Sequence, residues 1–140
     1  MNDCMYCKKD ERLTKLMTEV IRLELTTVYL YREQSYPGRL VVAMNRHVHK
    51  LTDLAPEEHA AFFAEVSKIA KALTELYHPD KINYLVLGDM SPHLHIHLVP
   101  KYQGGTDWGT LFQMMPEPQK YLSAEEEAAE VLKIKKALEA

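Results

Sequence analysis

No stretch of this sequence is long and apolar enough to suggest a membrane anchor. A membrane-spanning helix needs about 18 or more consecutive apolar residues, and no run in the 140 residues approaches that length. No signal peptide is recognisable before the first polar residues. We therefore expect a cytoplasmic protein without a membrane partner.

An excess of positive charge is also missing. The chain contains 17 Lys and Arg residues against 20 Asp and Glu residues, which gives a formal net charge of −3 at pH 7. A partner made of duplex nucleic acid requires a basic surface, so this balance argues against one. Internal repeats and long linkers are absent as well, and residues 1–140 are expected to form a single domain.

Cysteine is scarce, and Cys4 and Cys7 are the only two, spaced Cys-x-x-Cys. A redox pair and two incidental thiols both remain open as interpretations. A redox pair normally opens a helix that follows a strand, and no strand is predicted before Cys4. Two thiolates also cannot complete a four-ligand zinc site, which would need two further ligands from elsewhere in the chain.

The periodicity of the apolar residues predicts an α+β protein. Short β-rich runs joined by turns indicate a mainly antiparallel sheet of five strands. A long helix is expected to pack on this sheet, and a second helix to follow Ser123 at the C-terminal end. The expected strands are 20–25, 27–31, 40–44, 81–88 and 93–100, and the expected helices are a short turn at 12–17 and a long helix at 56–77.

Three histidines alternate with apolar residues in the last predicted strand. His93, His95 and His97 share one face of the strand, while the intervening residues share the other face and are expected to pack on the core. The pattern predicts a half-buried strand that Pro100 ends or places at a sheet edge. Three imidazoles in register are compatible with a polar outer face, a metal site or a phosphate-transfer site.

The run from His93 to Val99 resembles the signature of the histidine triad (HIT) family, which is His-φ-His-φ-His-φ-φ with φ apolar. The resemblance implies a HIT-like fold and a nucleotide hydrolase or transferase that acts at the α-phosphate. His95 would be the nucleophile that forms a nucleotidyl-histidine, and His97 would donate to the phosphate oxygens. Dinucleoside polyphosphates, nucleoside phosphoramidates and nucleotide sugars all remain possible substrates. The alternative is a non-catalytic nucleotide-binding or zinc-binding module.

The resemblance extends to the segment before the long helix, with departures. Residues 37–42 resemble the family's Gly-His-x-Leu-Val stretch, but Arg39 stands where the family has His. The loop before the triad is short and lacks the family's Gln. The nucleotide contacts expected from the resemblance and from position are therefore Glu33 for the ribose, with Asn83 and Ser91 as the nearest amide and hydroxyl.

Many HIT-like proteins use an N-terminal Cys-x-x-Cys, a later His and the first triad His to bind zinc. In this chain the resemblance implies a structural zinc site made of Cys4, Cys7, His47 and His93. It also implies a homodimer, to which we expect the amphipathic helix that begins at Pro56 to contribute.

Overall fold

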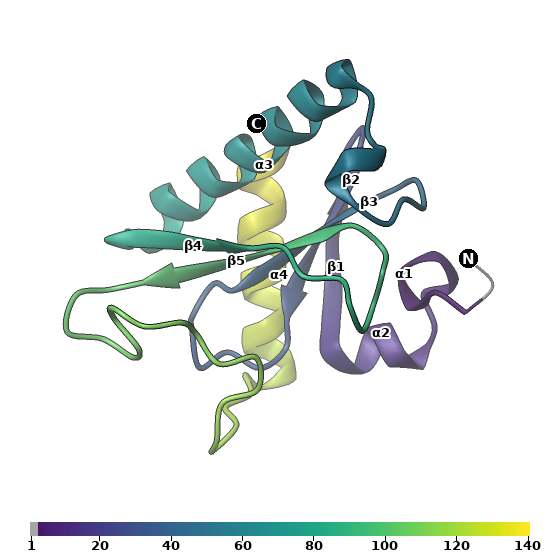
Figure 1. The fold of residues 1–140 in the computed structure, drawn as a ribbon. Helices are drawn as coiled ribbons and strands as arrows, with labels where there is room; N and C mark the ends of the chain where they lie inside the picture. The colour runs from purple at the N-terminus through teal and green to yellow at the C-terminus, as the bar shows by residue number, and fades with distance from the viewer. Residues whose placement is uncertain (1–2) are drawn as a thin grey trace.

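Five antiparallel strands form one sheet in the order β1-β2-β3-β5-β4 in the computed structural model, which describes residues 3–140 (Figure 1). This arrangement confirms the expected α+β fold. The strands are β1 (Met17–Arg22), β2 (Thr26–Tyr31), β3 (Leu40–Met44), β4 (Lys81–Leu85) and β5 (His95–Lys101). The helices are α1 (Met5–Lys8), α2 (Glu11–Leu16), the 3-10 turn η1 (Leu51–Asp53), α3 (Pro56–Tyr77) and α4 (Ala124–Glu139).

Helices α3 and α4 cover the same face of the sheet (Figure 1). Pro56 occupies the first turn of α3, where its missing N–H is not needed, and the helix ends at His78 in the left-handed conformation. Ser123 caps α4 by accepting a hydrogen bond from the Glu126 amide. The main core lies between these helices and the sheet, and it includes Leu30, Val42, Phe62, Ile69, Leu73, Ile96, Leu98 and Ile134.

The other face of the sheet is covered by α1, α2 and the segment 102–122, which we call the C-terminal arm. Tyr6 and Leu13 from the two short helices pack there against Tyr29 and Tyr31 of β2. This cover corrects the expectation of a half-buried triad strand: both faces of β5 are buried. The side chains of His93, His95 and His97 are only 1%, 6% and 4% exposed.

Strand β5 lies inside the sheet, between β3 and β4, so the expectation that Pro100 marks a sheet edge is wrong for the strand as a whole. The pairing with β3 stops at Leu98, and β5 continues beside β4 alone, with Pro100 opposite Ile82. A proline lacks the N–H donor needed for a second ladder. Pro100 is tolerated because it follows the last residue of β5 paired to β3.

Several boundaries differ from the sequence prediction, and β5 begins at His95, so that His93 lies just before the strand. Strand β1 starts earlier than expected and contains a register shift between Glu19 and Ile21, which is a β-bulge. Strand β4 ends at Leu85, so residues 86–94 form a longer connection to β5 than the expected turn. The tight turn before β3 is Tyr36–Arg39, with Gly38 at φ 87°.

Within residues 3–140, no helix combines the length and the apolar character required to cross a membrane.

Candidate active site and adjoining metal-ligand cluster

Four side chains from three separate segments converge at one end of β5. Cys4 immediately precedes α1, and Cys7 lies within it. His47 follows β3, and His93 precedes β5. Their ligand atoms all lie within 4.8 Å of one another. The structure thus brings together the four residues that the sequence resemblance selected.

The distances in this cluster fit a tetrahedral metal site. Ideal zinc–ligand bonds place two nitrogens roughly 3.3 Å apart, and a sulfur and a nitrogen roughly 3.6 Å apart. The Nδ1 atoms of His47 and His93 are 3.1 Å apart, and Cys4 Sγ lies 3.3 Å from Nδ1 of His93. Cys7 Sγ lies 3.2 Å from Nδ1 of His47 and 3.6 Å from that of His93. Two thiols and two imidazoles are also a donor set that zinc prefers.

The ring of His93 is oriented for metal binding by its second nitrogen. Nε2 lies 2.6 Å from the backbone carbonyl oxygen of Met44. A carbonyl only accepts, so Nε2 carries the proton and Nδ1 keeps its lone pair for the cluster. Burial lowers the pKa of His93, which favours the neutral ring that a metal requires. Nε2 of His49 lies 3.1 Å from Nε2 of His47, so His49 contacts a residue of the cluster.

His95 is held in one tautomer by the chain itself. Its Nδ1 lies 2.6 Å from the carbonyl oxygen of His93, so Nδ1–H donates and Nε2 has a free lone pair. Burial lowers the pKa of His95, so the ring is neutral near pH 7. A neutral imidazole with an unprotonated Nε2 is a nucleophile that needs no further activation.

Tyr6 links the cluster to the histidine strand, a role that the sequence analysis missed. It lies between the two cysteines in sequence, and its ring packs 5.2 Å from that of His93 and 5.0 Å from that of His95. Helix α1, which carries Cys7, therefore also packs against the imidazole of His95 through Tyr6. An aromatic residue between two candidate ligands was the available signal, but nothing in the sequence showed that it faced His95.

Arg39 is the second residue whose role the sequence did not reveal. The side chain is fully buried, and its Nη2 lies 3.5 Å from Nδ1 of His97. The pKa of His97 is lowered to about 3, first by burial and then by the Arg39 and His95 charges. His97 is therefore neutral under ordinary conditions.

A cavity of about 440 Å³ opens over His95 and His97, within the range of small-molecule sites. Its walls come from α1, the α2–β1 junction, β2, the β4–β5 connection and the C-terminal arm, and most of them are apolar. Ser91 is part of the lining, and its contact with a ligand stays a prediction. The lining residues are Met5, Tyr6, Leu16, Met17, Tyr31, Leu87, Gly88, Asp89, Met90, Ser91, His95, His97 and Met114.

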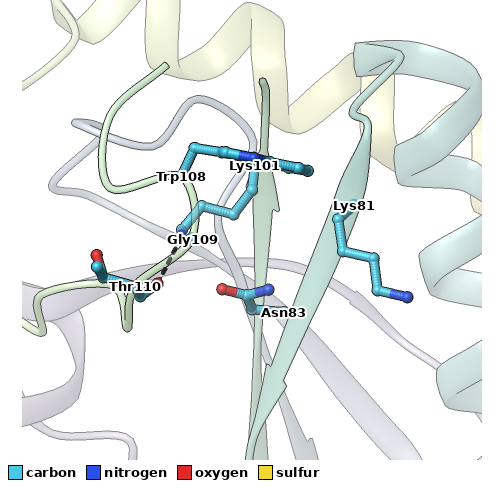
Figure 2. Close-up of a pocket in the computed structure, with 6 residues that line it drawn as sticks. All are labelled: Lys81, Asn83, Lys101, Trp108, Gly109 and Thr110. Atoms are coloured by element: carbon cyan, nitrogen blue, oxygen red, sulfur yellow. Dashed lines mark hydrogen bonds between the residues drawn. The ribbon is translucent and has the colours of Figure 1, made fainter. Parts of the chain in front are cut away.

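Asn83 lies outside this cavity. It is on the same sheet face as the histidines but lines a different pocket, together with Lys81, Lys101 and Trp108 (Figure 2). On that face, Val99 and Leu85 pack with Phe112 of the C-terminal arm next to His97. The structure thus does not bring Asn83 together with the other candidate nucleotide contacts.

Glu33 is also absent from the cavity lining. Its side chain is 1% exposed, and its carboxylate accepts hydrogen bonds from the amide and hydroxyl of Ser35 and from the amide of Lys120. Gln34 and Lys120 add a backbone hydrogen bond beside it. The carboxylate therefore holds the C-terminal arm against the end of β2, and ribose binding by Glu33 stays a prediction of the resemblance.

Residues 13–104 match the family model described as HIT domain, and this match covers more than half of the chain. The protein therefore belongs to the HIT family, as the His93–Val99 signature indicated.

Several curated proteins are similar to the chain at low identity. A bis(5'-adenosyl)-triphosphatase of Dictyostelium discoideum is 23% identical over 117 residues, which cover 77% of this chain and 78% of that protein. A bis(5'-nucleosyl)-tetraphosphatase [asymmetrical] of Schizosaccharomyces pombe is 26% identical over 85 residues, 57% of this chain. That match spans only 47% of the yeast protein's length.

Solved structures share the fold over nearly the whole chain. A histidine triad protein from Marinobacter aquaeolei superposes with a TM-score of 0.83 at 25% identity and covers 93% of this chain and 94% of its own. A Zn-bound histidine triad family protein from Mycobacterium smegmatis gives a TM-score of 0.67 at 22% identity, with coverage of 99% and 94%. At 22% identity, the likeness to the mycobacterial protein is a likeness of fold alone.

Proposed function

We propose that this protein cleaves or transfers nucleotides at the α-phosphate through a nucleotidyl-histidine intermediate on His95. The observation that carries the proposal is the hydrogen bond from His95 Nδ1 to the His93 carbonyl, because it leaves Nε2 as a free nucleophile beside an apolar cavity. The relatives named as dinucleoside polyphosphatases support the substrate class.

In the first step, Nε2 of His95 attacks the α-phosphorus, and the bond from phosphorus to the leaving group breaks. The leaving group departs with the bonding electron pair. In the second step, water attacks the same phosphorus, the phosphorus–nitrogen bond breaks, and a nucleoside monophosphate and a proton are released. Another acceptor in place of water makes the protein a transferase. His97 donates to the phosphate oxygens as their charge develops.

We further propose that Cys4, Cys7, His47 and His93 hold one structural zinc ion. Four protein ligands would leave no open coordination position, which distinguishes a structural from a catalytic site. A zinc ion held there would cross-link α1, the segment after β3 and the segment before β5. The donor set, its spacing and the Zn-bound mycobacterial neighbour support this proposal.

The test is capture of the intermediate. Protein incubated with a panel of diadenosine polyphosphates, adenosine phosphoramidates and nucleotide sugars is quenched rapidly and analysed by mass spectrometry. We expect a transient nucleotidyl adduct on His95. We also expect His95→Asn to lose the adduct and several orders of magnitude in turnover while it still binds nucleoside monophosphate, since loss of a nucleophile acts on the chemical step.

His59→Asn is the matched control. His59 lies on α3, which covers the opposite face of the sheet, and it does not line the cavity. Near wild-type turnover in the His95→Asn variant would rule out the mechanism. Nucleotide binding without turnover of any substrate would instead favour the non-catalytic alternative.

A further inference from the structure

Arg39 is a buried cation without an ion-pair partner among residues 3–140. Its guanidinium lies 3.8 Å from the ring centroid of Tyr31 and 5.1 Å from that of Phe112. Nη1 donates to the carbonyl oxygen of Met114 at 2.9 Å, and Nε has no acceptor within the described part of the chain. Arginine keeps its charge when buried, so the fold holds a buried positive charge without a direct ion pair here.

The acidic group that acts on this charge through space makes no direct ion pair with it. Glu33 interacts with Arg39 through space, but its carboxylate is hydrogen-bonded to Ser35 and Lys120. Burial is the main influence on Arg39 and lowers its pKa, as expected for a cation removed from water. A buried cation without a direct ion pair is costly, and such costly features concentrate at functional sites.

The contact between Arg39 and His97 defines the tautomer of the imidazole. A guanidinium only donates hydrogen bonds, so Nδ1 of His97, 3.5 Å from Nη2, must be the acceptor. The proton of the neutral ring is then on Nε2. The two aromatic rings that flank the guanidinium fix its plane, and the C-terminal arm fixes its other end, so the donor is preorganised.

We propose that Arg39 is the positioning residue of this site: it holds His97 as the neutral imidazole whose Nε2–H is the donor offered to substrate. This inference rests on the proposed function, in which His97 donates to phosphate oxygens. Arg39 acts through His97 and does not itself line the cavity. It thereby fills a position at which the resembled family carries a histidine.

Without Arg39, the neutral ring is free to carry its proton on either nitrogen. The tautomer with the proton on Nδ1 presents a lone pair at Nε2, which repels a phosphate oxygen. Loss of the arginine therefore weakens an interaction that strengthens as charge develops in the transition state. We expect the damage to appear in kcat more than in KM.

The test is the tautomer of His97 in the protein without substrate. Nitrogen-15 NMR distinguishes a protonated from an unprotonated ring nitrogen, and a His97→Gln variant assigns the signals. In the wild type we expect Nε2 protonated and Nδ1 unprotonated. Arg39→Met should give a mixed or reversed population, whereas Arg39→Lys, which keeps a charged donor, should preserve the wild-type pattern. Arg32→Met removes a partly buried ion pair with Glu127 and is the matched control.

Turnover of the best substrate completes the experiment. Arg39→Met should reduce kcat on the order of 10²-fold, the scale of a misplaced catalytic group, with a smaller change in KM. A wild-type His97 protonated on Nδ1, or an unchanged tautomer in Arg39→Met, overturns the inference. The wild-type measurement and the Lys variant decide the question even if the Met variant does not fold. Absence of adduct and turnover in the wild type overturns the proposed function instead, because the tautomer measurement needs neither.

Discussion

The tautomer of each of the three histidines follows from the hydrogen bond that one of its ring nitrogens makes. His93 donates from Nε2 to the Met44 carbonyl, His95 donates from Nδ1 to the His93 carbonyl, and His97 accepts at Nδ1 from an arginine. Backbone carbonyls only accept and guanidinium groups only donate, so each tautomer follows from the partner. Three chemically identical side chains thus present different ring nitrogens, as the proposed metal ligand, nucleophile and donor require.

Burial of His97 makes the stability of the protein depend on pH. The pKa of His97 is about 3 in the folded protein and about 6.5 when unfolded, so between these values only the unfolded chain binds the proton. Stability therefore falls as the pH drops below about 6.5, and the loss continues until about pH 3. The charged and titratable groups around the ring are Arg39, His95 and Tyr31.

We predict that the wild type loses more stability than His97→Gln between pH 7 and pH 5. Pairing the two proteins cancels the contributions of the other histidines. The excess loss should be about 2 kcal/mol at pH 5, which lies about 1.5 units below the unfolded pKa. Urea unfolding at the two pH values measures it. Parallel pH profiles for the two proteins would contradict the prediction.

At the scale of elements, α1 illustrates a helix too short to form alone. It has four residues, far fewer than an isolated helix needs in water. Its position depends on Tyr6, which packs on the histidine strand, and on the two thiols beside His47 and His93. A metal in this cluster would therefore order α1, and through Tyr6 it would order the ring of His95.

We predict about one zinc per chain in purified protein, lost in the Cys4→Ser, Cys7→Ser double variant. The melting temperature should fall by at least about 5 °C, because binding energy at a structural metal site is folding energy. Elemental analysis and calorimetry make the two measurements. Lys8→Ser, on the same helix but outside the cluster, should change neither. A metal-free native protein of full activity would contradict the zinc site.

For the whole molecule, the two faces of the sheet differ in what they carry. The face under α3 and α4 holds the main core, while the face under α1, α2 and the C-terminal arm holds the histidines and the cavity. The apolar stripe of α3 is used within the chain: Phe62 and Ile69 are fully buried, and only Phe63, at 42%, stays notably exposed. The helix is therefore a weaker candidate for a dimer contact than the sequence analysis assumed.

The homodimer stays a prediction, and the edge of the sheet at β4 is the surface we expect to form it. Strand β4 has one neighbour, and Tyr84 on it is 54% exposed. An open edge with an exposed aromatic residue favours pairing with a second copy. Light scattering at micromolar concentration should give twice the mass of one chain. Tyr84→Lys should shift it toward one chain, whereas Tyr121→Lys, at a similarly exposed tyrosine elsewhere, should not. A monomeric wild type would disprove the prediction.

The sequence by itself determined the features that depend on local periodicity and on a signature of fixed spacing. Alternation placed His95 and His97 on one face of a strand, although His93 lies just before that strand. The 3.6-residue period located α3, and the resemblance selected the four cluster residues that the fold brings together. These are short-range patterns, so they are visible before the chain folds.

Only the tertiary structure decided the burial of the triad face, the role of Tyr6 and the position of Arg39. Each depends on segments far apart in the chain: α1 on β5, the C-terminal arm on Arg39, and Lys120 on Glu33. Asn83 and Glu33 are the polar residues expected to contact the nucleotide, yet Asn83 lines another pocket and Glu33 is hydrogen-bonded within the chain. Periodicity shows which face a residue occupies, but what covers that face is set by long-range packing.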